Sequence, residues 1–125
     1  IRDHCVTGVQ TCALPIWMET VVQKGSGKGL QIPGYRIGGK TGTAQKAHNG
    51  VYIPGARICS FVAVLPVENP RYVVLVVVDE PQGGNAYGAT VAVPVARQIV
   101  EALLVLEQIP PSLPQAAMPK PALAH

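Results

Sequence analysis

The chain has 125 residues, 48% of them hydrophobic and only 14% charged, which is enough length and apolar content for one domain with a packed core. Its net charge of +3 is small, and its lysines stand among glycines without interleaved aromatic residues, which argues against a nucleic-acid-binding surface. The three cysteines form neither a CxxC pair nor a convincing disulfide framework. No continuous apolar run approaches the roughly 18 residues of a membrane span, and no signal peptide is recognisable.

The beginning of the chain differs from the rest. Residues 1–16 contain two of the three cysteines, Cys5 and Cys12, and show neither strand nor helix periodicity. The string from Val6 to Ile16 resembles translated sequencing-adapter DNA. We therefore expect residues 1–16 to be an artefactual or disordered leader outside the fold.

A helix and a strand are expected next. Residues 17–22 place apolar side chains four positions apart, as on one face of a short helix. The glycine-rich segment 25–29 predicts a solvated loop, and Pro33-Gly34 a turn. Residues 35–44 form the first expected strand, in which the glycines indicate close approach of a ligand or another backbone.

Two further strands and a second helix complete the pattern. Asn49-Gly50 predicts a tight turn, residues 57–65 a central strand, and residues 71–78 a strand that is apolar on both faces and therefore covered on both. A helix from about Ala89 is expected to pack through one apolar stripe, made of Val91, Val95, Ile99, Ala102, Leu103 and Leu106. Residues 110–125 are typical of a disordered Pro-rich tail. The expected domain therefore spans residues 17–109 and has an α+β fold, with three antiparallel strands flanked by helices.

The residues that suggest chemistry are Lys40-Thr41-Gly42-Thr43, at the end of the first strand. The lysine cation and two hydroxyls can bind a carboxylate, and Gly42 keeps a groove open where a Cβ would obstruct a substrate. Residues 34–41 also satisfy the G-x-x-x-x-G-K-[ST] pattern of a phosphate-binding P-loop, and residues 73–80 resemble the strand and acid that hold magnesium in such enzymes. A P-loop must follow a buried strand and open a helix, and the flanking residues favour neither, so nucleotide binding is the weaker hypothesis.

The longer stretch Tyr-Arg-Ile-Gly-Gly-Lys-Thr-Gly-Thr-Ala-Gln, at residues 35–45, resembles the transpeptidase domain of class B penicillin-binding proteins. In these enzymes K-T-G is the third signature, after S-x-x-K and S-x-N. The resemblance covers roughly residues 17–109 and implies the fold shared with serine β-lactamases, in which this strand is the edge of a five-stranded sheet beside the active-site cleft. It implies that Lys40 joins the active-site hydrogen-bond network, that Thr41 and Thr43 bind the carboxylate of substrate or β-lactam, and that the Thr43 amide is one oxyanion-hole donor.

The resemblance also implies an activity and a setting. The enzyme would be a peptidoglycan D,D-transpeptidase that cross-links stem peptides by serine acyl transfer in cell division or elongation, without cofactor or metal. Its partners would be stem peptides, β-lactams and proteins of the cell-wall synthesis complex, with no nucleic acid. It would act at the extracytoplasmic face of the bacterial plasma membrane, anchored only through an N-terminal part that precedes this chain.

The nucleophile motif of the family does not occur in the chain. The serines are Ser26, Ser60 and Ser112, and none has a lysine three residues later or forms S-x-N. We therefore expect a C-terminal fragment of such an enzyme, inactive by itself. A non-catalytic binding domain stays open as a further alternative.

Overall fold

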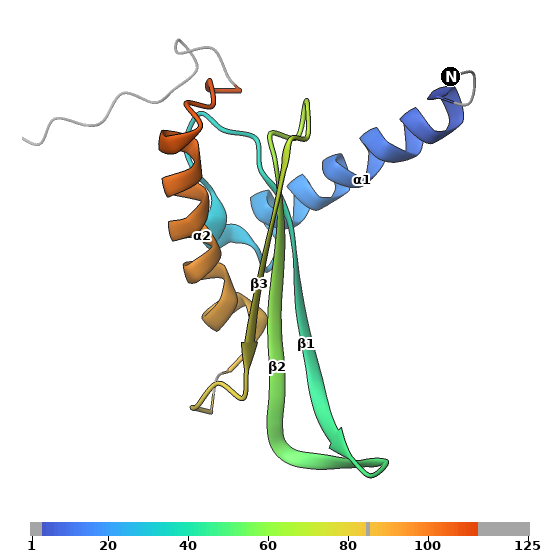
Figure 1. Ribbon diagram of the computed structural model, residues 1–125, viewed down its shortest axis with the longest axis vertical. Coiled ribbons are helices and arrows are strands. Elements are labelled where there is room, and N and C mark those ends of the chain that lie inside the picture. The colour runs from blue at the N-terminus through green and yellow to red at the C-terminus, as the bar shows by residue number, and fades with distance from the viewer. Residues whose placement is uncertain (1–3, 85, 113–125) are drawn as a thin grey trace, which may run out of the picture.

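The computed structural model describes the backbone of residues 4–84 and 86–112 and the side chains from residue 13 onward within these ranges. The elements follow in the order α1 (His4–Lys24), the 3-10 helix η1 (Lys28–Leu30), β1 (Gly38–His48), β2 (Val51–Leu65), β3 (Tyr72–Asp79) and α2 (Gly88–Leu106). In Figure 1, α2 lies along one face of the three-stranded sheet, and α1 crosses near the start of β1 and projects away. The expected α+β fold, an antiparallel sheet flanked by helices, is confirmed.

Strand β2 is central, as expected, with β1 antiparallel on one side and β3 antiparallel on the other. Asn49 and Gly50 both have positive φ, 50° and 79°, which is the backbone of a tight two-residue hairpin turn. Strand β2 begins at Val51, earlier than the expected residue 57. Pro54 does not end it, because the register between β1 and β2 shifts there and the missing N–H of a proline costs no ladder hydrogen bond.

The face that α2 buries differs from the expected stripe. Its fully covered side chains are Ala92, Val93, Ala96, Val100 and Leu104, whereas Val95, Ile99 and Leu106 are exposed. The covered side chains pack with Phe61 and Leu65 of β2 in one core cluster. Helix α2 is apolar around most of its circumference, so a 3.6-residue period alone could not select the buried face. The small side chains of Ala92 and Ala96 are on the buried side, where they allow the helix to lie close to the sheet.

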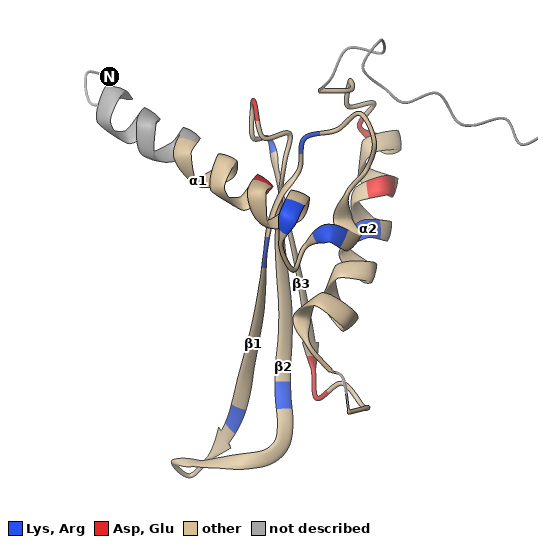
Figure 2. Cartoon of the chain, turned by 180° about the vertical axis from the view of Figure 1, so that it is seen from behind, with Lys and Arg blue, Asp and Glu red and all other residues tan. Residues whose placement is uncertain are grey.

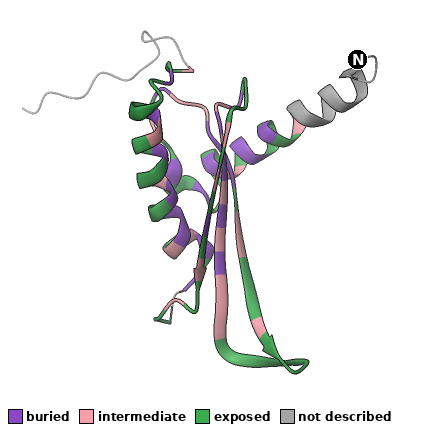
Figure 3. Cartoon of the chain, in the orientation of Figure 1, coloured by how far each residue is buried: buried purple, intermediate pink, exposed green. Residues whose placement is uncertain are grey.

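The expectation that β3 is covered on both faces is wrong for this chain. The side chains of Val73, Leu75 and Val77 are 70%, 64% and 56% exposed, whereas Val76 is 7% exposed and faces the core. Helix α2 covers one face of β3, and no other described element covers the opposite face (Figure 3). A run of valines indicates that a strand is suited to burial on both faces. The layer that covers each face must be supplied by other elements of the protein.

Helix α1 is longer than the expected helix at residues 17–22, since it begins at His4. Part of the expected leader is therefore helical, while its suspected origin in adapter DNA stays a prediction. Most of the expected tail, residues 113–125, lies outside the described residues. Within the described part of the chain, α2 alone is long and apolar enough to cross a membrane by length and composition, a test that core helices also pass.

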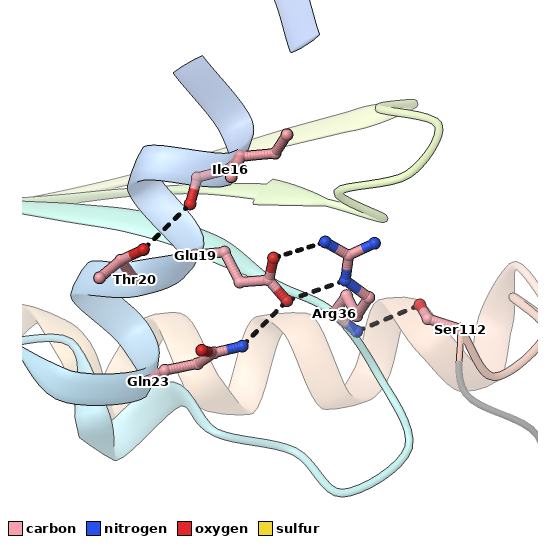
Figure 4. A network of polar contacts seen from close by, with 6 residues as sticks. All are labelled: Ile16, Glu19, Thr20, Gln23, Arg36 and Ser112. Carbon is pink, nitrogen blue, oxygen red and sulfur yellow. Dashed lines mark hydrogen bonds and ion pairs between the residues drawn. The ribbon is translucent and has the colours of Figure 1, made fainter. Parts of the chain in front are cut away.

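A polar network ties α1 to the segment that leads into β1 (Figure 4). The Arg36 guanidinium donates from Nε and Nη2 to the two carboxylate oxygens of Glu19, at 2.9 and 2.7 Å. Gln23 also donates to Glu19 at 3.1 Å, and Glu19 is only 7% exposed. The Arg36 backbone N–H donates to Ser112 Oγ at 3.1 Å, which brings the end of the described chain to the same place. Hydrogen bonding to Glu19 raises the pKa of Arg36 above its ordinary value, so the guanidinium is charged throughout the physiological range.

The substitution Glu19→Gln tests how much this network stabilises the fold. We expect the intact transpeptidase domain that contains this segment to lose about 1–3 kcal/mol of unfolding free energy, because the Arg36 charge loses its carboxylate partner in a half-buried site. Chemical denaturation measures the loss. The matched control is Glu101→Gln, which removes the exposed i,i+4 pair with Arg97 and should cost less than about 0.5 kcal/mol. Equal effects of the two substitutions would contradict a structural role of the Glu19–Arg36 pair.

The exposed face and free edge of β3 predict that the isolated chain self-associates, because an apolar strand with unpaired backbone groups is a template for further pairing. Light scattering at increasing protein concentration should show growing assemblies. Leu75→Lys should reduce them, whereas Val105→Lys, which places the same charge at an exposed position of α2, should not. A monodisperse monomer that melts cooperatively at high concentration would refute this prediction.

Candidate functional site

Strand β1 approaches its neighbours so closely that two of its glycines have no room for a side chain. A β-carbon on Gly39 would lie 2.3 Å from Cζ of Phe61 in the core. One on Gly38 would lie 3.0 Å from both Cβ of Met18 and the carbonyl oxygen of Pro15, in α1. Adjacent strand residues face opposite sides of a sheet, so α1 and the core hold β1 from both sides. These contacts place the next residues, Lys40 to Thr43.

The four residues Lys40-Thr41-Gly42-Thr43, here called the tetrad, follow directly after these two glycines in β1. Lys40 is exposed, and its Nζ donates to the carbonyl oxygen of Thr41 at 2.8 Å. Thr41 is half-buried, and its hydroxyl oxygen lies 2.8 Å from Ser26 Oγ. Thr43 is exposed, and its hydroxyl accepts a hydrogen bond from the backbone N–H of Gly88 at 3.1 Å. Strand alternation therefore places the two hydroxyls on one face of β1 and the side chain of Lys40 on the other.

Gly42 is needed for a contact within the sheet. A β-carbon there would lie 2.5 Å from Oγ of Ser60, its partner on β2. The role of Gly42 in keeping a substrate groove open stays a prediction. Strand β1 forms an edge of the described sheet, so its alternate backbone N–H and C=O groups face away from β2, where an extended peptide could pair with them.

Two residues at this site were missed by sequence reasoning. The sequence places Ser26 in the loop 25–29, which is expected to be solvated, and Gly88 just before the helix expected from about Ala89. In the structure, Ser26 contacts Thr41, and Gly88 begins α2 and contacts Thr43. Both residues lie in short glycine-containing segments, and such segments indicate that another part of the chain approaches the backbone closely. The sequence pattern does not identify which part that is.

The geometry does not support the P-loop interpretation. Lys40 and Thr41 lie in a strand that continues to His48, so no helix N-terminus follows to bind phosphates. Asp79 and Glu80 instead form ion pairs with Lys46 Nζ, at 3.1 and 2.7 Å. The hydrogen bonds that Lys46 Nζ donates to Glu80 and to Asp79 raise the pKa of Lys46. Among the described residues, no three His, Cys, Asp or Glu side chains gather as a metal site.

None of the three serines has the environment of an acylated nucleophile. Ser26 contacts Thr41, Ser112 accepts from the Arg36 backbone, and Ser60 lies beside Gly42. Within the described residues, no lysine amine lies within hydrogen-bond distance of any of these hydroxyls. Figure 2 shows the lysine and arginine residues at separate places on the helices, the strands and the segments that connect them.

The chain is similar in sequence to proteins of one known family. The model described as "Penicillin binding protein transpeptidase domain" matches residues 16–101. A curated relative, the peptidoglycan D,D-transpeptidase FtsI homolog of Mesostigma viride, is 47% identical over 98 residues, which make up 78% of this chain and 16% of the relative. The chain therefore spans only a small part of the length of such relatives.

Solved structures agree with the sequence comparisons. The ligand-free transpeptidase domain of Burkholderia pseudomallei penicillin-binding protein 3 aligns with a TM-score of 0.69 at 40% identity, over 80% of this chain and 30% of that one. Penicillin-binding protein 3 of Mycobacterium tuberculosis, solved with ampicillin, aligns with a TM-score of 0.69 at 27% identity, over 86% of this chain and 26% of that one. The chain therefore belongs to the penicillin-binding protein transpeptidase family and contains part of a peptidoglycan D,D-transpeptidase domain.

Proposed function

We propose that this chain supplies the substrate-binding strand of an enzyme that cross-links peptidoglycan stem peptides by serine acyl transfer. The observation that carries the proposal is the geometry of β1, an edge strand that displays Lys40 and the hydroxyls of Thr41 and Thr43 in a chain of this family. An extended peptide can pair with such an edge through its backbone, while the two hydroxyls bind its carboxylate and Lys40 supplies positive potential nearby.

Each residue of the tetrad has a proposed role. Acyl transfer needs a nucleophile, a base, an oxyanion hole and groups that orient the substrate. Lys40 supplies positive potential and a hydrogen-bond donor to the active-site network. Thr41 and Thr43, with Gly42 between them, bind the carboxylate of a stem peptide or β-lactam, and the Thr43 amide donates to the oxyanion. The relative from Mycobacterium tuberculosis was solved with ampicillin, which supports the assignment of β-lactams as ligands.

The nucleophile and its lysine are proposed to come from a part of the enzyme outside this chain. No serine in the chain has the S-x-x-K spacing, and curated relatives are much longer than the chain. The chain alone therefore offers an oxyanion donor and a carboxylate site without a group to acylate. The whole enzyme would act at the extracytoplasmic face of the plasma membrane, in division or elongation, together with other proteins of cell-wall synthesis.

Substitutions in the intact enzyme test the roles of the tetrad. Lys40→Ala should abolish most acylation by penicillin, because it removes the cation and a donor of the network. Thr43→Ala should weaken recognition of the carboxylate by about 1–3 kcal/mol, as expected for a lost hydrogen bond to a charged group. Rates of labelling by a fluorescent penicillin measure both effects.

A matched control lies in the same strand. Lys46→Ala removes an equal charge whose partners are Asp79 and Glu80, and it should leave the labelling rate near that of the wild type. If Lys40→Ala and Thr43→Ala also react at the wild-type rate, β1 is not part of the active site and the proposed function is wrong.

The isolated chain should neither react covalently with fluorescent penicillin nor bind ATP, since it lacks an activated serine and a helix after Thr41. Mixing it with the missing upstream portion should restore labelling if the two parts fold together. Covalent labelling of the chain alone would show that it holds its own nucleophile. Tight magnesium-dependent ATP binding would reinstate the P-loop, and failure of the mixed parts to bind penicillin would favour a non-catalytic binding domain.

A further inference from the structure

Two residues outside the tetrad each hold one of its hydroxyls. We propose that Ser26 and Gly88 are positioning residues, which orient the hydroxyls of Thr41 and Thr43 toward a carboxylate of the ligand. The inference rests on the proposed function, because it assumes that the two threonines bind that carboxylate. It adds two contacts from elements far from β1 in the sequence, the loop after α1 and the first residue of α2.

Gly88 determines what the Thr43 hydroxyl can do. The Gly88 N–H donates to Thr43 Oγ1 at 3.1 Å, so one lone pair of this oxygen is occupied. Within the described residues, the Thr43 hydroxyl has no protein acceptor for its own proton. A hydroxyl that accepts a hydrogen bond is polarised and becomes a better donor. The contact thus leaves the proton of Thr43 available to a ligand and strengthens the bond that it can form.

The contact requires glycine at position 88. A β-carbon there would lie 2.8 Å from the carbonyl oxygens of both Gly42 and Ser60, and 3.3 Å from Cβ of Thr41. The φ of Gly88 is outside the left-handed region, so close approach and not backbone conformation excludes other residues. Alanine is intrinsically better than glycine in a helix by about 1 kcal/mol. A side chain at this position would push the start of α2 away from β1 and lengthen the bond to Thr43.

Ser26 holds the other hydroxyl. Its Oγ lies 2.8 Å from Thr41 Oγ1, and either oxygen can be the donor. When Ser26 is the donor, the proton of Thr41 stays free for a carboxylate of the ligand, and this is the orientation that suits binding. The serine is itself fixed in place, because the N–H groups of its neighbours Gly25 and Gly27 both donate to the carbonyl oxygen of Val21, at 2.9 and 3.1 Å. The loop after α1 is therefore attached to the helix on both sides of Ser26.

The two oriented hydroxyls suit one carboxylate. Residues two apart in a strand face the same side and are separated by about 6.6 Å along it. Hydrogen bonds of about 2.6 Å from each hydroxyl to the two oxygens of a single carboxylate can bridge that separation. Fixing both hydroxyls before binding removes the entropic cost of ordering them, so the expected effect of Ser26 and Gly88 is on affinity for the acid and not on the acylation step.

The test uses the intact parent enzyme and stopped-flow labelling with fluorescent penicillin, which separates the dissociation constant of the penicillin from the limiting acylation rate. We expect Gly88→Ala to raise the dissociation constant at least tenfold with a limiting rate within a factor of two of the wild type. Ser26→Ala should raise it several-fold, and Ser26→Thr, which restores the hydroxyl, should return it to the wild-type value. The matched control is Gly84→Ala, in the segment between β3 and α2. A β-carbon on Gly84 meets no atom within 4 Å, so no effect is expected.

A double-mutant cycle shows whether Gly88 acts through Thr43. Thr43→Val removes the hydroxyl and keeps the shape, so adding Gly88→Ala to it should raise the dissociation constant little further. A purely structural role of Gly88 would instead give independent effects in the two backgrounds and would overturn the inference for this residue. If Gly88→Ala does not fold, the comparison of Ser26→Ala with Ser26→Thr decides, and equal affinities of these two variants overturn the proposal.

Failure of the positioning roles can be distinguished from failure of the proposed function. A wild-type enzyme that is not acylated, or a fully reactive Lys40→Ala variant, would refute the proposed function itself. Wild-type affinity in Gly88→Ala and Ser26→Ala, together with the expected loss in Lys40→Ala, would refute only the positioning roles.

Discussion

The constraint on which this structure depends is the close approach of β1 to its surroundings. A β-carbon on Gly39 would collide with Phe61 in the core, and one on Gly38 would press on α1. Glycine at both positions weakens the strand intrinsically but lets helix and core contact the backbone from opposite faces. The residues that follow then emerge at a defined place and angle. The glycines therefore help to determine where the lysine and hydroxyls of the tetrad lie.

Polar contacts complete this positioning. The ion pair between Glu19 and Arg36 joins α1 to the segment just before β1, and Ser112 joins the end of the described chain to the same arginine. A half-buried pair of this kind adds modest stability but high geometric specificity, since both hydrogen bonds of the guanidinium must be satisfied at once. Segments far apart in the sequence thus meet around the start of one strand, a few residues before the proposed substrate-binding tetrad.

The sheet has an uncovered apolar face, as expected of a chain that contains only part of a domain. The side chains of Val73, Leu75 and Val77 form an apolar face on β3 that no described element covers, while the opposite face packs on α2. The solved relatives extend well beyond the aligned part, which makes up 30% of the Burkholderia domain. Strand β3, whose outer face lacks a covering layer, is separated from β1 and its tetrad by the central strand β2.

The sequence by itself determined the order of the elements, the turn at Asn49-Gly50 and the tetrad, because each depends on residues that are neighbours in the chain. The turn needs residues that accept positive φ, the strands need alternating apolar residues, and the tetrad is a cation with two hydroxyls in succession. Only the tertiary structure decided which face of α2 is buried, because the helix carries more apolar side chains than one face can bury and the sheet selects which of them are covered. It also decided the partners of Thr41 and Thr43. Ser26 and Gly88 lie far from them in the sequence, and long-range contacts of this kind arise only from how the helices pack against β1.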